Sequence, residues 1–250
     1  MAFQKSIKVT CVTEFVEQFF AKLRSSTLFR GHRECVWDLL PMIDRVDHGG
    51  LTRDDHERLM LEEFDKRSRL VRDLPFPNAW ELHAVARHHG VPTRLLDWSE
   101  SPLTALFFAT LGQSQGDSVV WCYCYIAEDG GLDINSCASP LKAKDIILFD
   151  PPQVHPRITG QSGKFTVHPT SSKDFDKWPG FLNQIIIPKD YRAQIRHELF
   201  RLGIHYHNLF PDLDGIGTHI YNTWCRQQDE PNPFVQPTAS ADDPNGSPQS

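Results

Sequence analysis

Apolar residues recur at helical spacing near the beginning of the chain. Residues 13–24 place their charged side chains on one side and their apolar side chains on the other, namely Phe15, Phe19 and Leu23. This spacing predicts an amphipathic helix. Residues 27–31 are apolar before an Arg-Gly pair, and we expect a short strand there.

Capping residues begin three further helices, at Thr52, Asn78 and Ser101. The first two have an acidic residue three positions later, as in a capping box, and the third precedes a proline at the first helical position. Gly90 and Gly112 then stop the second and third helices.

The long charged helix after Thr52 is expected to bury Leu59, Leu70 and the residues near Phe64. Later, residues 189–202 have helical period, with Ile195, Leu199 and Leu202 expected inward. A final helix is predicted from three apolar residues at helical spacing, Ile216, Ile220 and Trp224.

Strand patterns dominate the second half of the chain. Residues 117–126 are apolar and aromatic almost throughout, which predicts a central strand, and weaker strands are expected over 146–149, 164–168 and 184–188. Helices come first and strands mostly later, so we predict an α+β fold with N-terminal helices packed on a mixed, mostly antiparallel β core. Residues 1–225 form one domain in this interpretation, and residues 226–250, rich in Pro, Gln, Asp, Ser and Asn, form a disordered tail.

Composition narrows the class of protein. The chain has 250 residues, 40% of them hydrophobic, and a net charge of -6, which disfavours non-specific binding of nucleic acid. No segment is long and apolar enough for a membrane span, and we expect a cytoplasmic protein without membrane contact. None of the six cysteines forms a CxxC pair. Cys122 and Cys124 alternate on the predicted central strand, so buried thiols in a reducing compartment are favoured over a zinc site.

Residues 88–98 carry candidate chemistry, because polar side chains interrupt an apolar stretch. On an extended segment Thr93 and Asp97 share one face and Arg94 points to the other. Arg94 serves either a site or a buried ion pair. Trp98 either stacks on a ligand or packs in the core, and His89, like its neighbour His88, either caps the preceding helix or takes part in proton transfer or base stacking.

Three segments together resemble the FRG domain family, named for a Phe-Arg-Gly motif. They are residues 28–31 with Trp37, Leu39, Pro41 and Arg45; residues 88–109; and residues 209–215, with Arg157, Ile158 and the Gln161-x-Gly-x-Phe pattern between. The resemblance runs from Leu28 to Trp224. Members occur in bacteria and phages, sometimes near defence genes, which implies a role in antiviral defence or as a toxin.

The same pattern is distantly similar to the ADP-ribosyltransferase superfamily, in which an aromatic-Arg-Gly ends the first core strand. Thr93-Arg94-Leu95 stands where that superfamily has Ser-Thr-Ser. The resemblance implies an ADP-ribosyltransferase-like fold and an enzyme that uses NAD as its substrate, without a metal, to modify DNA, RNA or protein. The residues it implies for binding NAD are Arg30, Gly31, His89, Thr93, Arg94 and Trp98, and the candidate catalytic residues are Gln161, Asp212, Asp214 and Asp97. Asp212 is equally suited to cap the last helix.

Two other functions remain open from the sequence. A metal-dependent nuclease would draw on His88, His89, Asp97, His205, His207, Asp212 and Asp214, although no tight metal-binding motif occurs. The other is a catalytically inactive module that senses a nucleotide or binds a protein partner through the N-terminal helix or the tail.

Overall fold

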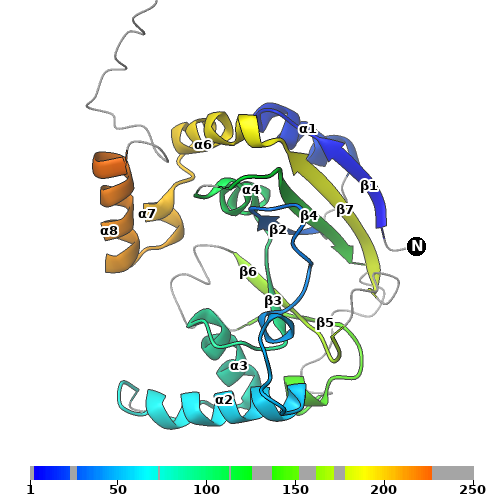
Figure 1. The fold of residues 1–250 in the computed structure, drawn as a ribbon, viewed down its shortest axis with the longest axis vertical. Helices are drawn as coiled ribbons and strands as arrows, with labels where there is room; N and C mark the ends of the chain where they lie inside the picture. Colours follow the sequence, from blue (N-terminus) through cyan, green and yellow to red (C-terminus); the bar gives the residue numbers. More distant parts are fainter. Residues whose placement is uncertain are drawn as a thin grey trace, which may run out of the picture.

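One mixed β-sheet organises the part of the chain that the computed structural model describes. The described residues are 3–22, 27–72, 74–112, 114–125, 137–151, 162–171 and 178–226. Gln161 and residues 227–250 of the predicted tail lie outside them. Within the described residues the α+β class is confirmed (Figure 1).

The sheet has seven strands in the order β1-β7-β4-β2-β3-β6-β5. Their bounds are β1 (Phe3–Lys8), β2 (Thr27–His32), β3 (Leu95–Ser99), β4 (Ser118–Tyr125), β5 (Ile147–Phe149), β6 (Gly163–Val167) and β7 (Gly180–Ile187). Only β1 and β7 pair in parallel, and the other neighbours are antiparallel. The expected mixed, mostly antiparallel core is therefore confirmed, with β4 between two strands as predicted.

Three of the described helices begin at the predicted capping residues. They are α1 (Val12–Lys22), α2 (Arg53–Ser68), α3 (Ala79–His88), α4 (Pro102–Thr110), α6 (Arg192–Arg201), α7 (Tyr206–Leu209) and α8 (Leu213–Tyr221). Short turns are η1 (Met42–Arg45), η3 (Pro140–Lys142), η5 (Lys189–Tyr191) and the π-helical η6 (Asn222–Arg226). The side chains of Thr52, Asn78 and Ser101 each accept a hydrogen bond from the backbone amide three residues later, which confirms these caps.

Alternate residues of β4 divide the core between the two faces of the sheet. Val120 and Cys122 pack with α1, α4 and α6, in a cluster that includes Phe15, Phe29, Leu106, Ile195 and Leu199. Trp121 and Tyr123 pack on the opposite face, in a cluster that includes Leu28, Trp98, Trp178 and Leu182. Cys122 and Cys124 are both buried, as expected.

A third cluster joins α3 to β3, β5 and β6, and it includes Trp80, Ala84, Leu95, Phe149 and Phe165. Figure 1 shows α2 and α3 beside this part of the sheet, away from α1 and α6. The sheet therefore has two differently covered ends, and β2 and β3 lie where they meet.

Several predicted buried positions are wrong. Leu59, Leu70 and Leu202 are 43%, 88% and 59% exposed. These residues lie on helices, or just past helix ends, that have few apolar positions, so the helical period alone did not identify the face that packs.

Helix α2 buries Glu57 and Leu61 in place of the expected residues. Glu57 is fully buried because it binds Arg94 of the segment before β3: the Arg94 Nε donates to its Oε2 at 2.7 Å and the Arg94 amide to its Oε1 at 2.7 Å. The spacing of apolar residues along the sequence cannot identify a helix face that is buried through a charged residue.

Candidate functional site

The sheet opens between β2 and β3. These strands share only the pair Phe29 and Ser99, whereas β2 pairs with β4 through six residues from Thr27 to His32. No other residue pair joins β2 to β3 in the described part of the chain, so the sheet is open beyond this pair. Side chains from both edges can therefore enter the gap.

Arg30 bridges the opening. Its Nη1 donates to the backbone oxygen of Asp97 at 2.8 Å and lies 3.3 Å from Asp97 Oδ2. A side chain of β2 thus takes the place of a backbone hydrogen bond to β3. The Arg30 side chain is only 16% exposed. It belongs to β2 on one side of the gap and is held by Asp97 of β3 on the other.

Arg87, near the end of α3, reaches the same carboxylate. Its Nε donates to Asp97 Oδ2 at 3.0 Å, and its Nη2 contacts the same oxygen. Asp97 therefore joins two guanidinium groups that come from a strand and a helix far apart in the sequence.

The charges at this point shift the pKa of each group. Burial lowers the pKa of Arg30 to about 10, against the attraction of Asp97, and the charges of Arg87 and Arg45 lower it further. Burial raises the pKa of Asp97, but the charges and hydrogen bonds of Arg87 and Arg30 outweigh burial, so its pKa lies below the ordinary value. Asp97 is consequently ionised at neutral pH.

His32 holds the other edge of the Arg30 guanidinium, since its Nε2 accepts from Arg30 Nε at 3.0 Å. Burial, then the charges of Arg30 and Arg45, lower the pKa of His32 to about 2. A neutral imidazole fixes Arg30 by accepting a hydrogen bond without cancelling its charge.

These residues line a cleft of about 560 Å³. Its charged side chains are Arg30, Arg33, Arg45, Arg87 and Asp97, and its rings are Phe29, His32, Trp37, His88, Trp98, Phe108 and Phe210. We call it the arginine cleft. It combines an excess of guanidinium groups with flat apolar walls, which suits an anion that carries rings.

Four of the residues predicted to bind NAD or to act in catalysis line this cleft: Arg30, Gly31, Asp97 and Trp98. Packing also requires a glycine at position 31. A Cβ on it would lie 2.0 Å from the carbonyl oxygen of Ala105 and 2.5 Å from the amide nitrogen of Ala109. The missing side chain lets α4 approach β2. Trp98 borders the cleft, but it is only 3% exposed and its Nε1 donates to Thr166 Oγ1 at 2.8 Å.

Among the other predicted residues that the structure describes, His88 lines the arginine cleft, whereas His89, Thr93, Arg94, Asp212 and Asp214 do not. Thr93 is fully buried, and Arg94 is 1% exposed and held by Glu57 and Asp54. Arg94 is thus the buried brace that one of the two interpretations described. His89 is exposed and lines a different cavity.

The two aspartates near the end of the chain belong to α8. Asp212 caps this helix by accepting from the Gly215 amide at 2.8 Å, and Asp214 is exposed in its first turn. Gln161 lies outside the described residues, so its role stays a prediction.

Sequence reasoning did not assign a role to Arg87, Arg45 or His32. Arg45 and Trp37 belong to the motif that resembles the FRG domain, and this motif was the one sequence feature that could have identified Arg45 as a site residue. Arg87 meets Asp97 only through the placement of α3, which no local spacing encodes.

No group of three or more His, Cys, Asp or Glu residues suited to a metal ion occurs in the described ranges. The metal-dependent nuclease stays a prediction without such a cluster. In the same ranges, no helix has both the length and the apolar character to traverse a bilayer.

Comparison with known proteins supports one part of the resemblance. Residues 25–118 match the family model of the FRG domain. This span holds all five charged side chains of the arginine cleft, whereas Gln161 and residues 209–215 lie beyond it. No curated protein and no solved structure matches the chain.

Proposed function

We propose that this chain, with an FRG domain over residues 25–118, is an NAD-dependent enzyme of the ADP-ribosyltransferase type that modifies a macromolecule. The observation that carries the proposal is the arginine cleft, where Arg30, Arg33, Arg45 and Arg87 accompany one carboxylate, that of Asp97, among the described residues. The resemblance to ADP-ribosyltransferases rests on the sequence motifs alone.

The charge in the cleft suits a pyrophosphate. Four guanidinium groups against one carboxylate leave an excess of about three positive charges, enough to neutralise the two negative charges of the NAD pyrophosphate. Arg30 and Arg87 are already held in place, so little side-chain entropy is lost on binding.

The aromatic walls of the arginine cleft suit the nicotinamide and adenine rings of NAD. The exposed Trp37 and the partly buried Phe108 and Phe210 offer ring faces to a nicotinamide or an adenine. A cleft of about 560 Å³ lies within the usual range for sites that bind small molecules.

The reaction breaks the bond between nicotinamide and the ribose C1′. Nicotinamide leaves with the bonding electron pair, an acceptor nucleophile forms the new bond to C1′, and the acceptor loses a proton. Positive charge develops on the ribose as the bond breaks. A carboxylate that stays ionised at neutral pH, as Asp97 does, stabilises that charge. Gln161 is the second candidate for contact with the ribose.

The acceptor is a nucleic acid or a protein, in a conflict between bacteria and phages. The test is incubation of the full chain with NAD labelled in the adenylate phosphate and with bacterial extract, alongside Arg30→Ala and the control Arg58→Ala. Arg58 lies on α2 outside the cleft and is 47% exposed. We expect label transfer and nicotinamide release from wild type and Arg58→Ala but not from Arg30→Ala. No transfer and no loss of NAD with any extract would contradict an enzymatic role.

One observation favours a second candidate, a module that binds a nucleotide without chemistry. Asp97 accepts from both Arg30 and Arg87, so its carboxylate is engaged before any ligand arrives. Binding of NAD or ADP-ribose that raises the unfolding temperature, without nicotinamide release, would assign the cleft to this function.

A further inference from the structure

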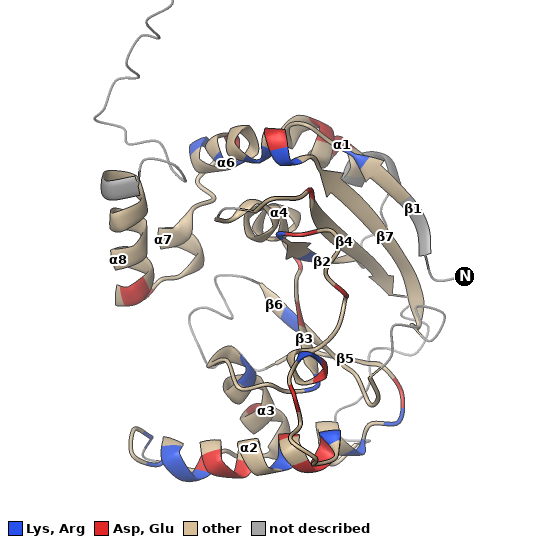
Figure 2. Ribbon diagram, in the orientation of Figure 1, with Lys and Arg blue, Asp and Glu red and all other residues tan. Residues whose placement is uncertain are grey.

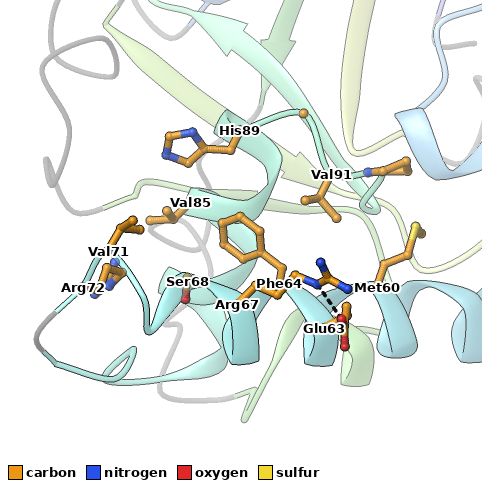
Figure 3. Close-up of a pocket in the computed structure, with 12 residues that line it drawn as sticks. Met60, Glu63, Phe64, Arg67, Ser68, Val71, Arg72, Val85, His89 and Val91 are labelled. Carbon is orange, nitrogen blue, oxygen red and sulfur yellow. Dashed lines mark hydrogen bonds and ion pairs between the residues drawn. The ribbon is translucent and has the colours of Figure 1, made fainter.

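A second cavity of about 910 Å³ lies between α2 and the end of α3 (Figure 3). One wall is α2, and the other is Val85 together with residues 89–92. We call it the α2 groove. It is separate from the arginine cleft, although Gly90 borders both.

The α2 wall of the groove follows one stripe of the helix. Met60 and Phe64 lie four residues apart on α2, and Val71 follows three residues after the helix ends at Ser68. Glu63, Arg67, Ser68 and Arg72 flank them. Figure 3 shows the Phe64 ring between the two walls, near Val85 and His89. The helical part of this wall, the nine residues from Met60 to Ser68, runs about 13 Å along α2.

Apolar side chains also project beside the groove. Leu70, Val71 and Leu74 are 88%, 87% and 74% exposed. We call them the apolar knob. Contiguous exposed apolar surface of this kind marks an interaction site. A groove with a knob at one end is self-complementary, since a twofold axis places the knob of each copy in the groove of the other.

The charges of α2 are also self-complementary. Beside the groove, exposed acids precede exposed bases: Glu62 and Glu63 come first, and Lys66, Arg67 and Arg69 follow. Nearer the start of the helix, the exposed Arg58 pairs with Asp55 and Glu62. Figure 2 shows these charges along α2. In an antiparallel pair of such helices the acidic part of one lies against the basic part of the other, which favours this orientation over a parallel one.

We propose that the α2 groove is the interface with a second copy of this chain, formed by antiparallel packing of the two α2 helices. The knob of each copy fills the groove of the other, and Glu63 faces Arg67 of the partner subunit. The equilibrium between monomer and dimer then depends on protein concentration. The proposal does not rest on the proposed enzymatic function.

Sedimentation velocity of the full chain over a range of concentrations tests the apolar contact. We expect wild type to shift from monomer to dimer in the micromolar range. Val71→Asp should weaken association at least ~10-fold, because it places a charge in the groove. Leu213→Asp is the matched control, since Leu213 is 85% exposed on α8, and its association should equal that of wild type.

A charge swap tests the orientation. Glu63→Arg and Arg67→Glu, both at exposed positions, should each be monomeric, because like charges then face each other. Mixed in equal amounts, the two variants should form a heterodimer, which the charge pair within one helix cannot produce. Circular dichroism checks that each variant is folded.

Three results would overturn the proposal. They are a wild type that stays monomeric throughout, association that Val71→Asp leaves unchanged, and a mixture of the swapped variants that stays monomeric. Stoichiometric binding of an apolar dye to a wild type that stays monomeric would assign the groove to a small molecule instead.

Discussion

Asp97 is the residue on which the arginine cleft depends. It holds Arg30 from β2 and Arg87 from α3, and without its charge the guanidinium groups repel one another across the opening of the sheet. Its side chain is 38% exposed, so solvent screens part of each interaction. We expect Asp97→Asn to lower the free energy of unfolding by about 1–2 kcal/mol, measured by urea denaturation. A variant as stable as wild type would show that Asp97 does not hold the cleft together.

The lowered pKa of Asp97 makes part of the stability depend on pH. The folded chain releases this proton more readily than the unfolded chain, whose carboxyl has the ordinary pKa of 3.8. The stabilisation is therefore complete above about pH 5 and is lost as pH falls through the folded pKa. Unfolding measured from pH 2 to 7 should show wild type and Asp97→Asn converging in stability at the acidic end. A constant difference across that range would contradict the assigned shift.

The pair of Glu57 and Arg94 is a separate structural brace, because both side chains are buried. Arg94→Met leaves the Glu57 carboxylate buried without its cation, and we expect a loss of about 3–5 kcal/mol in the free energy of unfolding. Adding Glu57→Gln should recover at least ~1 kcal/mol, since the amide keeps an acceptor for the backbone at residue 94. A double variant less stable than Arg94→Met would argue against this pairing.

At the scale of elements, the contact between β2 and α4 depends on Gly31. A side chain there meets the α4 backbone at Ala105 and Ala109, which cannot rotate away. We expect Gly31→Ala to cost about 2–3 kcal/mol in thermal or urea unfolding. Gly217→Ala is the control: nothing lies within 4 Å of its Cβ position on α8, and helix propensity predicts a neutral or slightly stabilising effect. Equal effects at both positions would contradict the close packing of α4 on β2.

Elements set by local chemistry could be predicted from the sequence. The caps at Thr52, Asn78 and Ser101 are confirmed because a cap is a contact between a side chain and a backbone amide three residues away. The apolar run of β4 marks an interior strand for the same local reason. β1 could not be recognised, because its mixed polar sequence becomes a strand only by pairing with β7 at the sheet edge.

The buried face of α2 and the cleft show where local patterns fail. α2 packs through Glu57, which binds Arg94, and no hydrophobic period reveals such an anchor. Arg30 and Asp97 were candidates because each stands out in its segment. Arg87 joins them only because α3 is folded against β3, and that placement is a property of the tertiary structure.

At the scale of the whole molecule, a net charge of -6 surrounds a cleft with an excess of positive charge. An anionic ligand is repelled at long range and attracted at short range, so its binding depends on the local guanidinium groups. We expect saturating NAD, at about 100 times its Kd, to stabilise the fold by about 2.7 kcal/mol in thermal unfolding. Arg87→Gln should lose most of this stabilisation. A ligand effect that survives in Arg87→Gln would place NAD elsewhere on the molecule.

The most direct test of the central claim, that the arginine cleft binds NAD, is calorimetric titration of NAD into wild type, Arg30→Gln and Arg58→Gln. Wild type and the exposed α2 variant Arg58→Gln should each bind one NAD per chain with equal affinity. Arg30→Gln should bind at least ~10-fold more weakly, a loss of about 1.4 kcal/mol or more. No binding by wild type, or equal binding by Arg30→Gln, would contradict the claim.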